Sequence, residues 1–286
     1  MSARPHALPP SVLELTGVWH RSLLVDADGR RDTTTAVTWV QGPARYADLR
    51  QPVNHPRHPG VTSLSGLRFE ELLALTRQEA FAGRLRQRSD VFHWARTLDF
   101  GPAGLPDAGR LRREGAVLVE TGVHVACVEH WRPVRSAGPS AAVELFDAET
   151  GCTGLLVRAG DRFAQVRDRA EPLPPDVSLA ELVRGAADIG RARALLDFEL
   201  SLGRIDHGRW TVERSTLPHR VGAVPAPALD GCAGLVVNDA RPDGTPYTRV
   251  FEITAAEGLL AALHSTGSTA LAASATSCAP APEGIG

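Results

Sequence analysis

Apolar and polar residues alternate with the two-residue period of β-strands along most of the chain. The runs that show it are short and rich in β-branched or aromatic residues, and Gly, Asp or Pro separates them. The predicted strands of the first half span residues 19–25, 33–40, 91–100, 117–121 and 123–131. Asp26 to Gly29 supplies the turn of a first hairpin, because Gly tolerates positive φ. This pattern predicts an antiparallel sandwich or barrel.

The second half repeats this rhythm after a short linker at residues 136–140. Its predicted strands span residues 142–146, 154–158, 162–167, 198–202 and 210–214. Helical spacing occurs over Leu67–Leu75, behind Ser65 as a cap, and again at either 178–182 or 189–196. The tripeptide Leu98-Asp99-Phe100 recurs as Leu196-Asp197-Phe198. A doubled β unit and one larger sheet system are the two interpretations.

Composition excludes several classes of protein. Hydrophobic residues make up 43% and charged residues 22% of the chain, which is typical of a globular protein. No apolar run is long enough to cross a membrane and no apolar signal segment opens the chain, so we expect no membrane partner and a cytoplasmic location. The net charge of −2 argues against a nucleic-acid partner. All 31 basic residues are Arg, which excludes P-loop and Schiff-base chemistry because both need a lysine.

Gly17-Val18-Trp19 opens the first predicted strand and is similar to the lipocalin G-x-W signature. The resemblance implies that Trp19 closes one end of a barrel and that an arginine, Arg132 or Arg214, packs across its ring. Together with the repeated meander, the chain resembles lipocalin-like two-barrel proteins that include the yeast HRI-type family, over about residues 13–220. The resemblance implies two consecutive antiparallel β-barrels and leaves function open.

The expected architecture is therefore mainly β, with two tandem lipocalin-like antiparallel β-barrels and one or two short helices. Its predicted parts are a flexible lead-in at 1–12, an N-terminal barrel at 13–135, a C-terminal barrel-like domain at 142–262 and a disordered tail at 265–286.

The interior of the N-terminal barrel is the predicted binding site. Strand alternation places Trp39 and Gln41 on one face of their strand, and Glu129 and Trp131 on one face of theirs, with His130 on the other. Ionisable groups on both faces imply either buried partners or a cavity. Glu129 is the candidate acid or base, because a partly apolar barrel raises the pKa of a carboxyl group. A salt-bridged Glu129 is the alternative.

Further candidate site residues lie on neighbouring strands. His93 would line the same cavity and form a catalytic pair with Glu129, although a surface position is the simpler alternative. Arg96 or Arg50 would hold a substrate carboxylate by paired hydrogen bonds. Tyr46 would donate a hydrogen bond to the ligand, or would be packed with its hydroxyl satisfied.

These residues predict a small-molecule-binding protein, and more specifically a biosynthetic enzyme of the lyase, isomerase or cyclase type that uses acid–base catalysis and no cofactor. The alternative is a non-catalytic binder or carrier of an apolar metabolite or haem. No metal site is expected, because the HxxH spacing of His55 and His58 lies in a Pro-rich loop without a regular face. The number and variety of ionisable side chains on the predicted strands favours the enzyme.

Overall fold

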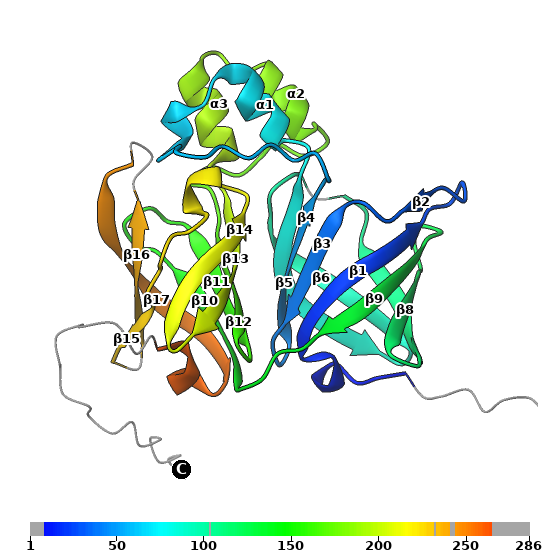
Figure 1. Cartoon of the computed structure of the whole chain (residues 1–286). Helices are drawn as coiled ribbons and strands as arrows, with labels where there is room; N and C mark the ends of the chain where they lie inside the picture. The colour runs from blue at the N-terminus through cyan, green and yellow to red at the C-terminus, as the bar shows by residue number, and fades with distance from the viewer. Residues whose placement is uncertain (1–8, 103, 232, 241–243, 265–286) are drawn as a thin grey trace, which may run out of the picture.

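The computed structural model describes residues 9–102, 104–231, 233–240 and 244–264. The prediction of a mainly β chain is confirmed: the strands form two antiparallel sheets that lie side by side (Figure 1). The first eight residues of the predicted lead-in and the predicted tail at 265–286 lie outside the described residues. None of the helices in the described ranges is long and apolar enough to cross a membrane.

Nine strands form the first sheet, which we call the N-terminal barrel. They are β1 (Gly17–Val25), β2 (Arg31–Asp32), β3 (Ala36–Gln41), β4 (Arg45–Gln51), β5 (Glu79–Arg88), β6 (Val91–Asp99), β7 (Asp107–Glu114), β8 (Val117–Gly122) and β9 (Val128–Val134). β1 pairs with both β3 and β9, so the sheet closes on itself. Register shifts at Arg21/Leu23 and at Ala82/Gly83 provide the local bends that such closure uses.

Eight strands form the second sheet, which curls into a C-terminal half-barrel. They are β10 (Ser140–Phe146), β11 (Thr153–Ala159), β12 (Arg162–Arg167), β13 (Glu199–Asp206), β14 (Arg209–Ser215), β15 (Ala228–Asp230), β16 (Gly234–Ala240) and β17 (Pro246–Gly258). The edge strands β14 and β15 are not paired with each other in the described residues. Instead, the irregular segment 222–225 spans the gap: Val212 donates its backbone N–H to Ala223, and Asn238 donates to Pro225.

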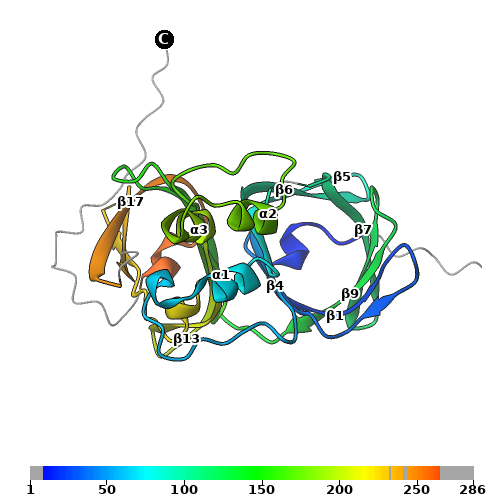
Figure 2. The same cartoon turned by 90° about the horizontal axis from the view of Figure 1, so that it is seen from above.

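Three short helices cover the junction of the two sheets at one end (Figures 1 and 2). They are α1 (Phe69–Leu75), α2 (Leu179–Arg184) and α3 (Ile189–Leu196). Both segments that the sequence offers as alternative second helices are therefore helical. The Ser178 side chain accepts a hydrogen bond from the backbone N–H of Glu181, and Asp188 accepts one from Arg191, which caps α2 and α3.

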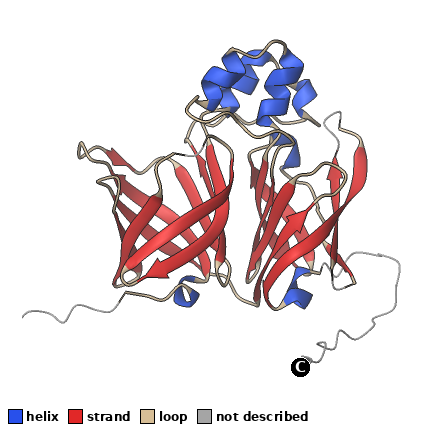
Figure 3. Cartoon of the chain, turned by 180° about the vertical axis from the view of Figure 1, so that it is seen from behind, coloured by secondary structure: helices blue, strands red, loops and turns tan. Residues whose placement is uncertain are grey.

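One apolar cluster joins the barrel, the half-barrel and the helices. Its buried members include Val40, Leu49 and Ala82 from the barrel, Leu155, Val157 and Leu200 from the half-barrel, and Leu72, Val183 and Leu195 from the helices. Figure 3 shows the two sheets from behind, with the helices seated above their junction. Separating the sheets would expose this cluster to water, so hydrophobic burial fixes their arrangement.

The predicted strand at 123–131 is wrong in its first half. β8 extends to Gly122, and the chain turns before β9 begins at Val128. Val123 and Val125, which suggested a strand by their β-branched side chains, are exposed in this turn. The turn lets Glu129 face Glu120 across the β8–β9 hairpin.

Replacing Leu49 with Ala tests the shared core. Leu49 is fully buried, so the cavity should lower the free energy of unfolding by about 2–5 kcal/mol. Both sheets should still unfold in a single transition, measured by urea denaturation with far-UV circular dichroism and tryptophan fluorescence. Val250→Ala, at a side chain 57% exposed, is the control and should change stability by about 0.5 kcal/mol or less. Two separate transitions would contradict a shared core.

Candidate functional site

Aromatic side chains fill one end of the N-terminal barrel. The Trp39 ring lies at the centre, with ring centroids 6.0 Å from Trp19, 5.8 Å from Trp94 and 5.6 Å from Trp131. Trp39 donates its indole N–H to Gln41 Oε1 over 3.0 Å, and Gln41 donates onward to the Gly42 carbonyl. The structure therefore places the predicted ligand contacts Trp39, Gln41 and Trp131 in a packed floor, where they contact protein groups.

The G-x-W tryptophan closes this floor, but with a different arginine from the two expected. Trp19 donates its indole N–H to the Leu15 carbonyl in a short 3-10 turn below the barrel. The guanidinium of Arg113 lies 5.7 Å from the Trp19 ring centroid. Arg214 instead donates to Thr38 Oγ1 and to Gln51, on the outer side of the barrel. Alternation on β7 could have identified Arg113, because it shares a face with buried Leu111.

Above the floor, the barrel interior changes from aromatic to charged. Glu129 binds Arg21 over 2.6 Å, and the Glu129 side chain is only 7% exposed. Asp48 and Arg50 form a second pair at 3.0 Å. Glu129 thus faces the interior, as alternation predicts, in the salt-bridged state that was the alternative to a free acid or base. A buried carboxylate such as Glu129 requires an ion-pair partner, because it has lost its contact with water.

Glu120 is the exception within this charged layer. It is the register partner of Glu129 on the adjacent strand, and its Oε2 accepts a hydrogen bond from the Trp131 indole N–H over 3.0 Å. In the described part of the chain, no arginine lies within salt-bridge distance of it. Burial raises the pKa of the Glu120 carboxyl group well above its ordinary value, and the charge of Glu129 adds to the shift.

The strand opposite Glu120 makes room for it with a glycine. A Cβ atom at Gly109 would lie 2.7 Å from Glu120 Oε1, closer than van der Waals contact allows. The site predicted from the sequence does not include Glu120. Alternation could have identified it, because it places Glu120 on the same face of the strand as buried Leu118. A carboxyl group on the apolar face of a strand is a candidate for a shifted pKa.

Tyr46, Arg50 and Arg96 surround the Phe81 ring inside the barrel. The guanidinium carbons of Arg96 and Arg50 lie 3.5 Å and 4.9 Å from the Phe81 ring centroid. Tyr46 packs edge-on against the same ring at 6.3 Å, and its buried hydroxyl has no hydrogen-bond partner in the described part of the chain. Burial raises the pKa of this phenol well above its ordinary value, so it stays protonated and can donate.

A cavity of about 410 Å³ opens beside this group, at the end of the barrel that the helices overhang. Phe81, Arg96 and Asp99 line it from the barrel, and the residues that lead into α2 line the opposite side. Arg96 also binds Asp107 over 2.7 Å and Asp99 over 3.3 Å. Arg96 and Asp99 thus form part of the cavity wall on the barrel side, and Glu120 and Glu129 are not among the residues that line the cavity.

His93 is not part of this site. It alternates along β6 with Phe92 and Trp94, which belong to the barrel interior, so it lies on the outer face. The expected pairing of His93 with Glu129 is therefore absent from the structure. A bulge at Thr97 also breaks the expected alternation of this strand and brings Asp99 to the same face as Arg96.

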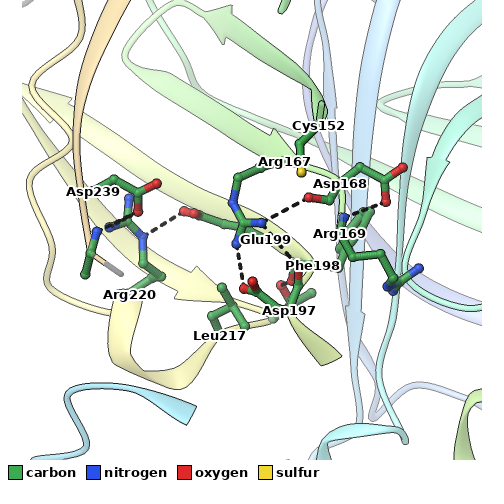
Figure 4. Close-up of polar contacts among 12 residues, drawn as sticks. Cys152, Arg167, Asp168, Arg169, Asp197, Phe198, Glu199, Leu217, Arg220 and Asp239 are labelled. Atoms are coloured by element: carbon green, nitrogen blue, oxygen red, sulfur yellow. Dashed lines mark hydrogen bonds and ion pairs between the residues drawn. The ribbon is translucent and has the colours of Figure 1, made fainter. Parts of the chain in front are cut away.

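A second charged cluster lies inside the C-terminal half-barrel (Figure 4). Arg220 binds Glu199 at 2.9 Å and Asp239 at 3.1 Å. Arg167 binds Asp197 at 2.7 Å, and Arg249 joins Asp239 at 2.6 Å. Each of these carboxylates has an arginine partner, whereas Glu120 has none among the residues that the structure describes. We therefore take the N-terminal barrel as the candidate site and interpret the second cluster as structural.

Comparison with known proteins gives one structural likeness. No family model and no curated protein matches the chain. The fold is similar to the crystal structure of the uncharacterised protein YLR301w from Saccharomyces cerevisiae, with 13% sequence identity and a TM-score of 0.48. The match covers 84% of this chain and 98% of that chain.

Replacing Asp239 with Asn tests the structural role of the second cluster. Burial acts to raise the pKa of Asp239, but the surrounding arginines outweigh it and hold the pKa below its usual range. Asp239 thus contributes stability that is present above its unfolded pKa and lost as the pH falls through its folded pKa. The Asn variant should have a free energy of unfolding about 3–5 kcal/mol lower at pH 7, because two buried arginines lose a partner.

Urea denaturation at pH 7 and at successively lower pH measures both effects, and the variant should lose stability less steeply in acid than the original protein. Asp206→Asn, at an exposed hairpin carboxylate, serves as the control and should leave both quantities unchanged within about 0.5 kcal/mol. An Asp239→Asn protein as stable as the original at pH 7 would refute the structural role.

The raised pKa of Glu120 predicts a protonated carboxyl group at neutral pH. Infrared spectroscopy at pH 7 should show the carbonyl stretch of a neutral carboxylic acid, and Glu120→Gln should reduce it. Because the folded pKa lies above the unfolded one, the original protein should lose stability as the pH rises from the ordinary glutamate range toward that folded pKa, and the variant should not. Glu114→Gln, at an exposed glutamate of the same barrel, should retain the band.

Proposed function

We propose that the protein binds a small organic metabolite at the open end of its N-terminal barrel and moves a proton on it without a cofactor. The observation that carries this proposal is the pair Glu120 and Glu129. They are direct neighbours on adjacent strands, yet within the described ranges Glu129 has an arginine partner and Glu120 has none. Two carboxyl groups in unequal environments can divide the roles of acid and base between them.

In this mechanism Glu129, ionised beside Arg21, removes a proton from the substrate. Glu120, kept neutral by burial, donates a proton to another atom of the same molecule. Directly opposed side chains on paired strands have Cβ atoms about 5 Å apart, so both could act on one small substrate that reached them from the cavity at Phe81 and Arg96. Proton removal at one atom and delivery at another is the chemistry of an isomerase, a lyase or a cyclase.

The surrounding groups favour a substrate that is not strongly anionic. Arg50 and Arg96 already bind Asp48, Asp99 and Asp107, so a substrate carboxylate would have to displace one of these carboxylates. The Tyr46 hydroxyl has no hydrogen-bond partner among the described residues and can donate a hydrogen bond to a carbonyl or hydroxyl oxygen. Phe81 and Phe100 give the cavity apolar walls. A neutral, oxygen-bearing metabolite fits this lining best.

A carrier without catalysis is the second candidate, and the cavity of about 410 Å³ between apolar and charged walls supports it. Haem is a weaker choice of ligand. The histidines on the barrel strands, His20, His93 and His130, all lie on the faces opposite the interior residues, so they cannot reach an iron inside the barrel.

We further propose that the chain belongs with the lipocalin-like two-barrel proteins and acts in the cytoplasm. Support comes from the G-x-W tryptophan, which closes the barrel floor beneath an arginine as the resemblance implies. The second sheet follows the first along the chain in the same antiparallel, curled form.

Incubation with a metabolite extract in deuterated water tests the catalytic proposal. Mass spectrometry before and after should show one metabolite converted to a product that carries deuterium, because the carboxyl groups exchange protons with solvent. Glu129→Gln and Glu120→Gln should each slow this conversion about 100-fold or more. Glu114→Gln is the control and should convert at the original rate.

Retention of a metabolite without conversion, seen by native mass spectrometry, would instead identify a carrier. Conversion that both glutamine variants leave unchanged would refute the proposed mechanism. A Soret band in the freshly purified protein would replace it with a haem function.

A further inference from the structure

The outer wall of the N-terminal barrel carries a group of arginines that the proposed function does not use. They project from β5 and β7, on either side of β6, and with one histidine they form what we call the arginine face: Arg84, Arg86, Arg88, His93, Arg110 and Arg112. The arginines of this face are all exposed. The face lies on the side of these strands opposite to the buried interior residues Leu85 and Leu111.

Strand pairing places these side chains in adjacent rows. Arg86 is the register partner of His93, and Val91 is the partner of both Arg88 and Arg110. Neighbouring strands lie about 4.8 Å apart, and residues two apart on one strand lie about 7 Å apart. The arginine face therefore spans about 14 Å along β5 and about 10 Å across the three strands.

The positive charge of this face is only partly balanced. Asp90 binds Arg110 over 2.9 Å, and Glu114 binds Arg112 over 2.8 Å. Arg84, Arg86 and Arg88 have no carboxylate within salt-bridge distance in the part of the chain that the structure describes. The chain as a whole carries a net charge of −2, so the overall charge does not reveal this local excess of positive charge.

We propose that the arginine face binds an acidic segment of a partner protein in an extended conformation. Acidic residues at every second position of an extended chain recur about every 7 Å, which matches Arg84, Arg86 and Arg88 along β5. Guanidinium groups bind carboxylates through paired hydrogen bonds. The aromatic residues Phe92 and Trp94 of the central strand point inward, so this face offers no ring for stacking bases. Charge and shape together favour a peptide over a single-stranded nucleic acid.

Fluorescence anisotropy with a labelled peptide of four Glu-Ser repeats tests this proposal. The peptide should bind the full chain with an affinity that falls as salt is added. Replacing Arg84, Arg86 and Arg88 together with Gln should weaken binding about tenfold or more, since three charge pairs are lost. A peptide with its four glutamates in one block, followed by four serines, should bind less tightly because its spacing does not match.

The triple variant Arg57→Gln, Arg184→Gln and Arg209→Gln is the matched control. It removes the same charge from exposed positions in a loop, in α2 and in β14, and should bind the peptide as the original chain does. Circular dichroism verifies that both variants are folded. Equal loss in both triple variants, equal binding of the two peptides, or tighter binding of oligo-dT than of the alternating peptide would each overturn the proposal.

Discussion

Closure of the first sheet forces every second side chain of its strands into one enclosed space, and the remaining structure follows from how that space is filled. At one end the interior is packed with the rings of Trp39 and its tryptophan neighbours, together with the amide of Gln41. At the other end the same alternation brings in charged groups. Each buried charge then needs a partner, because moving an isolated ion from water into the barrel has a large unfavourable free energy. Arg21, Arg50 and Arg96 are these partners.

Glu120 is a buried ionisable group that has no arginine partner among the described residues. The Trp131 indole donates a hydrogen bond to it, and burial raises the pKa of its carboxyl group well above the ordinary value. The half-barrel solves the same problem by ion pairing alone. Arg220 and Arg249 each bridge two carboxylates there, so its cluster stays charged and rigid. The two interiors therefore both bury charged groups, but the carboxylates of the half-barrel cluster each have an arginine partner, whereas Glu120 has none among the described residues.

Alternation was sufficient to predict the β class, the first hairpin and the inward face of Trp39 and Glu129, because these depend on a regular two-residue period. The predictions failed where that period is interrupted. The bulge at Thr97 moved Asp99 to the interior, and the turn after Gly122 removed Val123 and Val125 from the sheet. Propensity could not reveal the turn after Gly122, since β-branched residues occur on both sides of it. The partners of Glu129 and Trp19 depend on three-dimensional closure, which brings Arg21 and Arg113 to them from distant strands.

β5 to β7 carry opposite charge on their two faces, which separates the two proposed activities. The inner face carries Asp99 and Asp107 with Arg96, and the outer face carries the arginine face. Exposed charges on the wall are screened over about 8 Å at physiological salt, while the buried carboxyl groups inside are screened much less. An acidic segment bound outside would therefore leave the proton of Glu120 in place, because the packed rings of Phe92 and Trp94 and the sheet itself lie between them. Binding at the wall and chemistry in the interior can thus be altered independently, by substitutions on alternate residues of the same strands.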